Sequence, residues 1–181
     1  IQTNINTFFA NNLKKFGSVF RRSNLLTIID EIDEAILNTR MTIKVQQRLI
    51  PSLGIAKNYN ITFPVALATS DDTFKIITSS GFIFNSKECA IENRLNSSVL
   101  QIVNTGGAVV VDNIGSYNTE AGRIDLVGFN PTAFLSSAIN FIALPANQST
   151  IRPLRNFVLN IDTTSSVSNA ILDFQNTAVT L

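Results

Sequence analysis

Hydrophobic residues in the first part of the chain recur every three or four positions, which is the spacing of an amphipathic helix. Residues 1–20 keep this spacing, but their Asn-rich composition and Gly17 disfavour a regular helix. We therefore predict a short amphipathic segment whose aromatic side chains need a partner surface to cover them. Its apolar positions are Ile5, Phe8, Phe9, Leu13, Phe16 and Phe20.

The next periodic stretch predicts the clearest helix, from about Asn24 to Thr39, with Ser23 or Asn24 as its N-cap. Near its C-terminus Arg40 suits the helix dipole, whereas Arg21 and Arg22 oppose it at the start, which suggests a protein partner for that pair. The apolar stripe of this helix consists of Leu25, Ile28, Ile29, Ile32, Ala35 and Ile36. The rest of its surface carries carboxylates that we expect to be solvated, namely Asp30, Glu31, Asp33 and Glu34.

From Met41 onward the hydrophobic period falls to two, which predicts β-strands. Asn104-Thr105-Gly106-Gly107 predicts a tight hairpin, because glycine allows a positive φ. Pro153 predicts an edge strand or an irregular entry into one. The predicted fold class is α+β, an N-terminal helix followed by a mainly antiparallel β domain. The expected strands are 41–46, 60–63, 73–78, 82–84, 90–94, 99–103, 108–111, 123–129, 139–144 and 151–162, with turns at 79–81, 85–87 and 118–122.

The chain divides by pattern into three parts. Residues 1–22 are an N-terminal apolar and aromatic segment, and residues 23–162 are the helix with a β-rich oligomerisation domain. Residues 163–181 are a polar linker and C-terminal tail, in which 169–176 are expected to form either a weak helix or a mobile segment. Ile1 in place of Met predicts that the sequence is a piece of a longer polypeptide.

The amino-acid composition limits the classes of molecule that the chain is expected to bind. The 14 Lys and Arg residues nearly balance the 13 Asp and Glu residues, without clustering, which excludes the basic footprint of a nucleic-acid binder. Only 15% of residues are charged, against about 25% in typical globular chains, and 45% are hydrophobic. We therefore expect part of the apolar surface to meet other proteins. Because no run approaches about 20 apolar residues, no membrane contact is expected.

The sequence offers few of the residue types on which common catalytic sites depend. The chain has no histidine, which excludes Ser-His-Asp and Cys-His catalysis and imidazole metal ligands. Its single cysteine, Cys89, excludes an internal disulfide and is expected to be a buried structural residue. Asp71 and Asp72 precede a strand, where Asp side chains usually bond their own backbone. We predict no enzyme, metal, cofactor or small-molecule substrate.

Three segments together resemble the C-terminal part of the baseplate wedge subunit, gene product six, of T4-like contractile-tailed phages. They are Ile-Gly-Ser-Tyr-Asn at 114–118 with Gly122 and residues 124–129, then residues 145–156, then residues 30–40. The resemblance covers most of residues 22–162. It implies a late structural protein of the virion, assembled in the host cytoplasm, that forms homodimers or a higher ring oligomer. These dimers would help to close the inner ring of the baseplate and would bind other wedge and hub proteins.

The resemblance supplies no contact residues, so the candidate interface comes from the sequence pattern. The apolar candidates are Leu25, Ile28, Ile29, Ile32 and Ile36, and the charged candidates are Arg21, Arg22, Arg152 and Arg155. Arg152 and Arg155 have a plain alternative as solvated arginines of a strand edge. The alternative function is a carbohydrate- or receptor-binding β module of a phage fibre or adhesin, although the chain has no Trp and two Tyr. A glycosidase, resting on carboxylates alone, is the third possibility.

Overall fold

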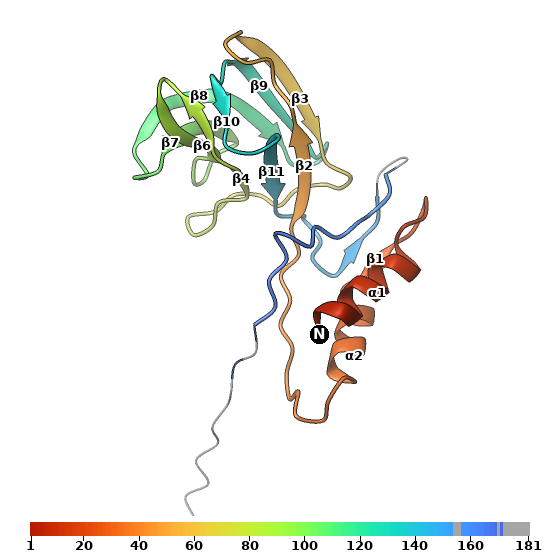
Figure 1. The fold of residues 1–181 in the computed structure, drawn as a ribbon. Helices are drawn as coiled ribbons and strands as arrows, with labels where there is room; N and C mark the ends of the chain where they lie inside the picture. Colours follow the sequence, from red (N-terminus) through yellow and green to blue (C-terminus); the bar gives the residue numbers. More distant parts are fainter. Residues whose placement is uncertain (154–156, 170, 172–181) are drawn as a thin grey trace, which may run out of the picture.

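A computed structural model describes residues 1–153, 157–169 and 171 of the chain. Two helices lie beside one end of a strongly curved β-sheet (Figure 1). Helix α1 spans Gln2–Asn12 and helix α2 spans Arg22–Asp30, with the short strand β1 (Phe20–Arg21) between them. The sheet is mainly antiparallel and nearly closed like a barrel, so the predicted α+β class is confirmed.

Ten strands form the curved sheet, and the described pairings are all antiparallel. The main path runs β2-β11-β4-β6-β7-β8-β9-β3, and β5 and β10 form a side branch from β6. The strand bounds are β2 Val45–Leu49, β3 Lys57–Thr62, β4 Ile77–Ser79, β5 Phe82–Phe84, β6 Lys87–Asn93, β7 Val99–Asn104, β8 Val109–Asn118, β9 Arg123–Phe129, β10 Ala133–Phe134 and β11 Ile139–Ala143.

The two outer strands of the main path, β2 and β3, follow one another in sequence and contact each other in space. The Ser52 amide, in the loop that joins them, donates to the Tyr59 hydroxyl at 2.9 Å. The barrel encloses large aromatic side chains, and the rings of Phe82 and Phe129 meet edge to face with centroids 5.1 Å apart. Alternate burial along β6, β9 and β11 follows the period-two pattern of their sequences.

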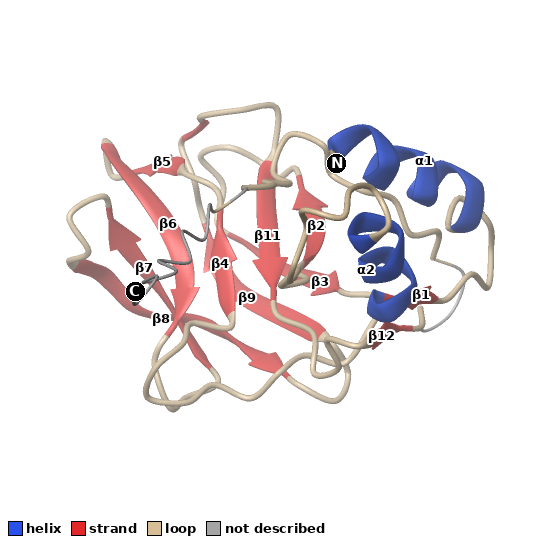
Figure 2. Ribbon diagram, turned by 90° about the horizontal axis from the view of Figure 1, so that it is seen from below, coloured by secondary structure: helices blue, strands red, loops and turns tan. Residues whose placement is uncertain are grey.

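The two helices pack on each other and on a small ribbon outside the barrel. In this ribbon β1 pairs with β12 (Thr150–Ile151), so that Phe20 faces Ile151. Phe20 stacks on Phe9 and meets Phe8 edge to face, with centroids 5.7 and 6.2 Å apart. The buried residues of the helices and of the barrel belong to one continuous hydrophobic cluster. Seen from below in Figure 2, both helices lie at the β2 side of the sheet.

The predicted long helix is wrong in its bounds. Helix α2 begins at Arg22, without a side-chain cap from Ser23 or Asn24, because the Arg22 amide continues the ribbon by donating to Ser149. It ends at Asp30, nine residues before the predicted end at Thr39. Carboxylates there oppose the dipole of the helix C-terminus, and the Asp33 carboxylate instead accepts the Ala35 amide in a turn. Conversely, residues 2–12 form a regular helix despite their Asn content, because Phe8 is buried by tertiary packing.

Most predicted strands are confirmed in place, but those expected at 41–46, 73–78 and 151–162 differ. Residues 41–44 are not in a strand, and β2 begins only at Val45. The strand expected at 73–78 starts only at Ile77, because the Asp71 carboxylate accepts the amides of Thr73 and Phe74 in a turn. Residues 79–81 break a strand without reversing it, since β4 and β5 both pair with β6. The strand expected at 151–162 stops at Ile151, because Pro153 has no amide to continue a ladder; residues 157–162 are not in a strand.

Residues 157–169 run between the barrel and the helices as an extended segment and continue away from both (Figure 1). A turn at 162–166 ends its first half. The Asp162 carboxylate accepts the amides and hydroxyls of Thr164 and Ser165, and the Asp162 carbonyl accepts from Ser166. The expected helix or mobile segment at 169–176 lies almost entirely outside the described residues. No helix within the described ranges is long and apolar enough to cross a membrane.

The hairpin between β7 and β8 confirms the predicted turn. Gly107 has φ +80°, whereas Gly106 does not have a positive φ, and the Asn104 side chain accepts the amides of Gly106 and Ala108. We expect Gly107→Ala to lower the free energy of unfolding by about 1 kcal/mol, because open space surrounds its Cβ and only the backbone is strained. Gly106→Ala is the matched control and should change much less. Urea denaturation measures both, and equal effects would contradict this assignment.

The hydroxyls of Thr164 and Ser165 lower the pKa of Asp162 to about 2. Because the folded pKa lies below the unfolded value, the turn is stabilised above about pH 4 and loses that stabilisation as the pH falls toward 2. We expect Ser165→Ala to raise the pKa of Asp162, and Ser168→Ala, outside the turn, to leave it unchanged. Carboxyl NMR shifts across a pH titration provide the measurement. An Asp162 pKa near 4 in the native chain would show that the turn does not form in solution.

Candidate subunit interface

Helix α2 carries its charges at the wrong ends for its own dipole. Its first turn holds no acidic residue and its last turn no basic one. Arg21 and Arg22 stand at the positive N-terminal end, while Asp30 and Glu31 stand at the negative C-terminal end. Each arrangement is unfavourable by a few tenths of a kcal/mol to about 1 kcal/mol at exposed positions. An opposite charge supplied from outside the chain would reverse the sign at both ends.

The turn between the helices and the β1–β12 ribbon together form a basic end. Lys14 and Lys15 lie in that turn, Arg21 pairs with Thr150 across the ribbon, and Arg152 follows the ribbon's second strand. Arg22, the first residue of α2, lies at the same end. Arg22 is half-buried, and the other four basic side chains are exposed. The structure therefore brings the predicted residues Arg21, Arg22 and Arg152 to one place. Arg155 lies outside the described residues.

The opposite end of α2 is acidic. Asp30, Glu31, Asp33 and Glu34 are all exposed, and Arg40 nearby offsets part of their charge. Among the described residues, none of these carboxylates and none of the basic-end cations forms a salt bridge. At 1.5 Å per residue, the nine residues of α2 separate the two ends by about 13 Å.

The predicted apolar stripe of α2 is divided between the interior and the surface. Leu25 and Ile29 are buried in the chain's own core, and Ile28 is partly buried against it. Ile36 is half-buried, and Ile32 is 37% exposed. Only the far end of the stripe is therefore open to another protein. The early end of the helix raises this exposure, because Ile32 lies just beyond the last turn.

Two further apolar side chains are exposed. Leu37, which the sequence analysis did not single out, is 76% exposed, and Phe16, for which we expect a partner surface, is 74% exposed. Both lie outside the helices, where the three-to-four spacing no longer describes which side faces the core. A third apolar group, Ile50, Leu53 and Ile55, is exposed on the loop between β2 and β3.

A groove of about 820 Å³ separates the helices from the barrel. Helix residues such as Ile5 and Phe9 line one wall, residues 41–47 form another, and residues 157–162 and 165–167 lie along it. This groove joins three parts of the chain that are distant in sequence. It is largely apolar at the helix wall and more polar where residues 160–166 pass.

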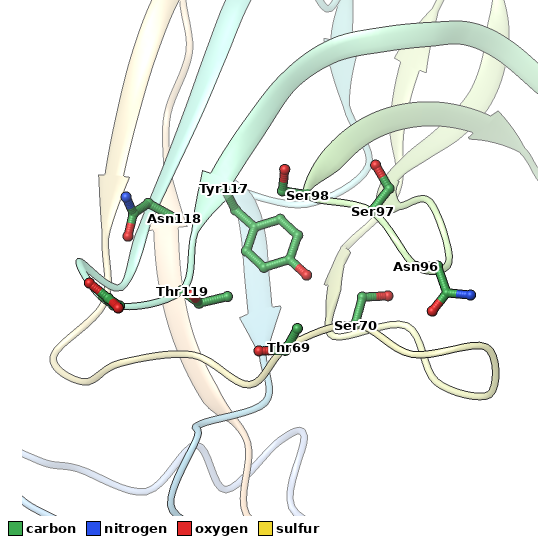
Figure 3. Close-up of a pocket in the computed structure, with 9 residues that line it drawn as sticks. Thr69, Ser70, Asn96, Ser97, Ser98, Tyr117, Asn118 and Thr119 are labelled. Carbon is green, nitrogen blue, oxygen red and sulfur yellow. The ribbon is translucent and has the colours of Figure 1, made fainter.

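A smaller pocket of about 390 Å³ lies at the C-terminal end of β8 and is lined mainly by hydroxyl and amide side chains (Figure 3). The Tyr117 side chain points toward it, but the residue is 5% exposed, and burial raises the pKa of its phenol. Tyr59 is half-buried with its ring against Phe129. Neither tyrosine therefore offers an open ring face for stacking on a sugar, which disfavours the carbohydrate-binding alternative.

The candidate reactive groups have structural roles. Backbone hydrogen bonds from Thr73 and Phe74 lower the pKa of Asp71, the opposite of what a general acid requires. Cys89 is buried in β6, and burial raises the pKa of its thiol, which keeps it protonated. In the part of the chain that the structure describes, no three acidic or cysteine side chains gather as a metal site would require.

The comparison with known proteins points to the helical end of the molecule. No curated protein matches the chain. Residues 1–48 match the family model described as "Baseplate structural protein gp6, C-terminal domain III". The match confirms the resemblance found in residues 30–40, adds the first helix, and does not extend to residues 114–129 or 145–156. Residues 1–48 are therefore similar to a domain of a baseplate structural protein, a non-enzymatic component of the phage virion.

Proposed function

We propose that this subunit self-associates in the baseplate, as a homodimer or a higher ring oligomer, through its helical unit (residues 1–40), and that it binds other wedge and hub proteins. These contacts between copies would help to close the inner ring. The observation that carries the proposal is the reversed charge pattern of α2, together with the match of this same region to a baseplate structural domain. A late protein assembled in the host cytoplasm fits this role.

The charge pattern favours a second copy as the partner. If two helical units lie antiparallel about a twofold axis, the basic end of each meets the acidic end of the other. Both unfavourable dipole interactions then gain a counter-charge at once. The exposed Ile32 and Leu37, beside the acidic end, supply apolar area between these charged contacts. Such an arrangement places charges at the rim, where they set register and association rate.

The apolar part of this contact is tested with Ile32→Asp and Leu37→Asp. Each is expected to raise the dimer dissociation constant tenfold or more, about 1.4 kcal/mol, because a twofold contact is damaged on both sides. Leu95→Asp is the matched control, since Leu95 is 40% exposed on a barrel loop and should not affect association. Light scattering across concentration gives the mass, and circular dichroism checks folding. A wild-type chain that stays monomeric at high concentration would overturn the proposal.

The charged part is tested by removing the net charge of one end at a time. Lys14→Glu with Lys15→Glu cancels most of the positive charge of the basic end, and Glu31→Lys with Glu34→Lys cancels the negative charge of the acidic end. We expect each double variant alone to dimerise less than the wild type, and an equal mixture of the two to associate again. Added salt should weaken the wild-type dimer and the mixture alike, because these charges are exposed. Two double variants that each dimerise as the wild type does would exclude the antiparallel arrangement.

A further inference from the structure

Two extended segments in the groove have the side-chain pattern of β-strands and are not in strands. In residues 41–44 and 157–161, the odd-numbered side chains are half-buried and the even-numbered ones are exposed. This alternation is what a strand shows when one face packs on a core. The half-buried side chains are Met41, Ile43, Phe157, Leu159 and Ile161.

The backbone of both segments is unpaired within the described chain. Between described residues, no backbone-to-backbone hydrogen bond involves residues 41–44 or 157–161. The Ile43 amide instead donates to the side-chain Oε1 of Gln148 at 2.9 Å. The Nε2 of the same Gln148 is buried and has no hydrogen-bond partner among the described residues. A side chain thus takes the place of a neighbouring strand beside Ile43 and leaves a buried donor unused.

The C-terminal segment is prepared as a strand by its neighbours in sequence. The turn at Asp162, with its hydroxyl and amide donors, ends the extended stretch at a defined residue. Phe157, Leu159 and Ile161 line the same groove as Met41 and Ile43. Side chains are therefore placed for sheet packing, while the main-chain groups that would complete the sheet remain open to another strand.

We propose that residues 157–161 of one copy pair, as a β-strand, with residues 41–44 of a second copy, and that the two copies exchange these strands reciprocally. The inference rests on the proposed self-association and gives it a mechanism. The exchanged strand lies in the groove against Ile5 and Phe9, which belong to the helical unit. Each exchange also brings main-chain carbonyls to the unused Gln148 donor.

The occupant is a second copy because the surfaces that would meet are already matched within one chain. Residues 157–161 pack into a groove built from residues 41–47 and α1, so the same contact forms between copies without new complementarity. Each copy contributes residues 157–161 as a strand and residues 41–44 as the edge that pairs with the other copy's strand. Two copies therefore form a closed twofold dimer in which neither segment remains unpaired. An unrelated protein would have to reproduce the alternation of residues 157–161 independently.

Cysteine pairing distinguishes exchange between copies from contact within one chain. In a Cys89→Ala background of the full 181-residue chain, one tagged copy carries Ile43→Cys and a second copy carries Phe157→Cys, Leu159→Cys or Ile161→Cys. Neighbouring strands place Cα atoms about 4.5–5.5 Å apart, within disulfide range. We expect at least one pair to give a covalent heterodimer under mild oxidation. Val158→Cys and Asn160→Cys, at the exposed positions of the alternation, are the matched controls and should give several-fold less.

The outcomes separate this inference from the proposed function. Covalent heterodimers at inward positions, and few at outward ones, support the exchange. A further variant carries Ile43→Cys and one of the 157–161 cysteines in the same chain. If the protein is dimeric by mass but disulfides form only within single chains of this variant, the exchange is overturned and self-association stands. Equal yields at inward and outward positions would also overturn the exchange, because the strand register would be absent. Circular dichroism of the Cys89→Ala background confirms that the variants are folded.

Discussion

The pairing of Phe20 with Ile151 determines where the helical unit sits. This two-residue ribbon joins the end of the β domain to the start of α2, and the Arg22 amide extends it by donating to Ser149. Phe20 then packs with Phe8 and Phe9, which buries the apolar face of α1. Without this ribbon the helices would lack a fixed direction relative to the barrel. The groove and the basic end both follow from it.

The ribbon also explains the charges at the start of α2. Since β1 leads directly into α2, Arg21 and Arg22 are held at the positive end of the helix dipole. A helix with a free N-terminus would place Ser, Thr or Asp there. The chain thus contains an unfavourable charge arrangement that an isolated domain would have no reason to keep. In the proposed self-association, a neighbouring copy compensates these charges.

The barrel contains a buried polar residue whose hydrogen bonds are satisfied internally, although the buried Asn130 Oδ1 has no partner among the described residues. Asn93 is fully buried, and its carbonyl accepts the amides of Ile76 and Ile77 while its amide donates to Ser70 and to the Arg94 carbonyl. The ion pair of Lys75 with Glu92 is partly solvated. The unpaired backbone of residues 41–44 and 157–161, by contrast, lies at the groove between the barrel and the helices.

Local pattern determined much of this protein from the sequence alone. Alternation placed β7, β8, β9 and β11, because a strand with one buried face must repeat every two residues. The hairpin at residues 104–107 followed from the positive φ that Gly107 adopts. The missing histidine and the low charge pointed away from catalysis, and the motif at residues 30–40 pointed to the baseplate family that the comparison confirmed.

Only the tertiary structure decided which regular patterns became regular elements. Residues 31–39 continue the helical spacing, yet α2 ends at Asp30, because carboxylates at a helix C-terminus and the Asp33 turn outweigh it. Residues 157–161 alternate as a strand does, yet a strand needs a backbone neighbour and the described chain supplies none. Spacing along the chain records which side of a segment is apolar. It does not record which surface, in this copy or another, will cover that side.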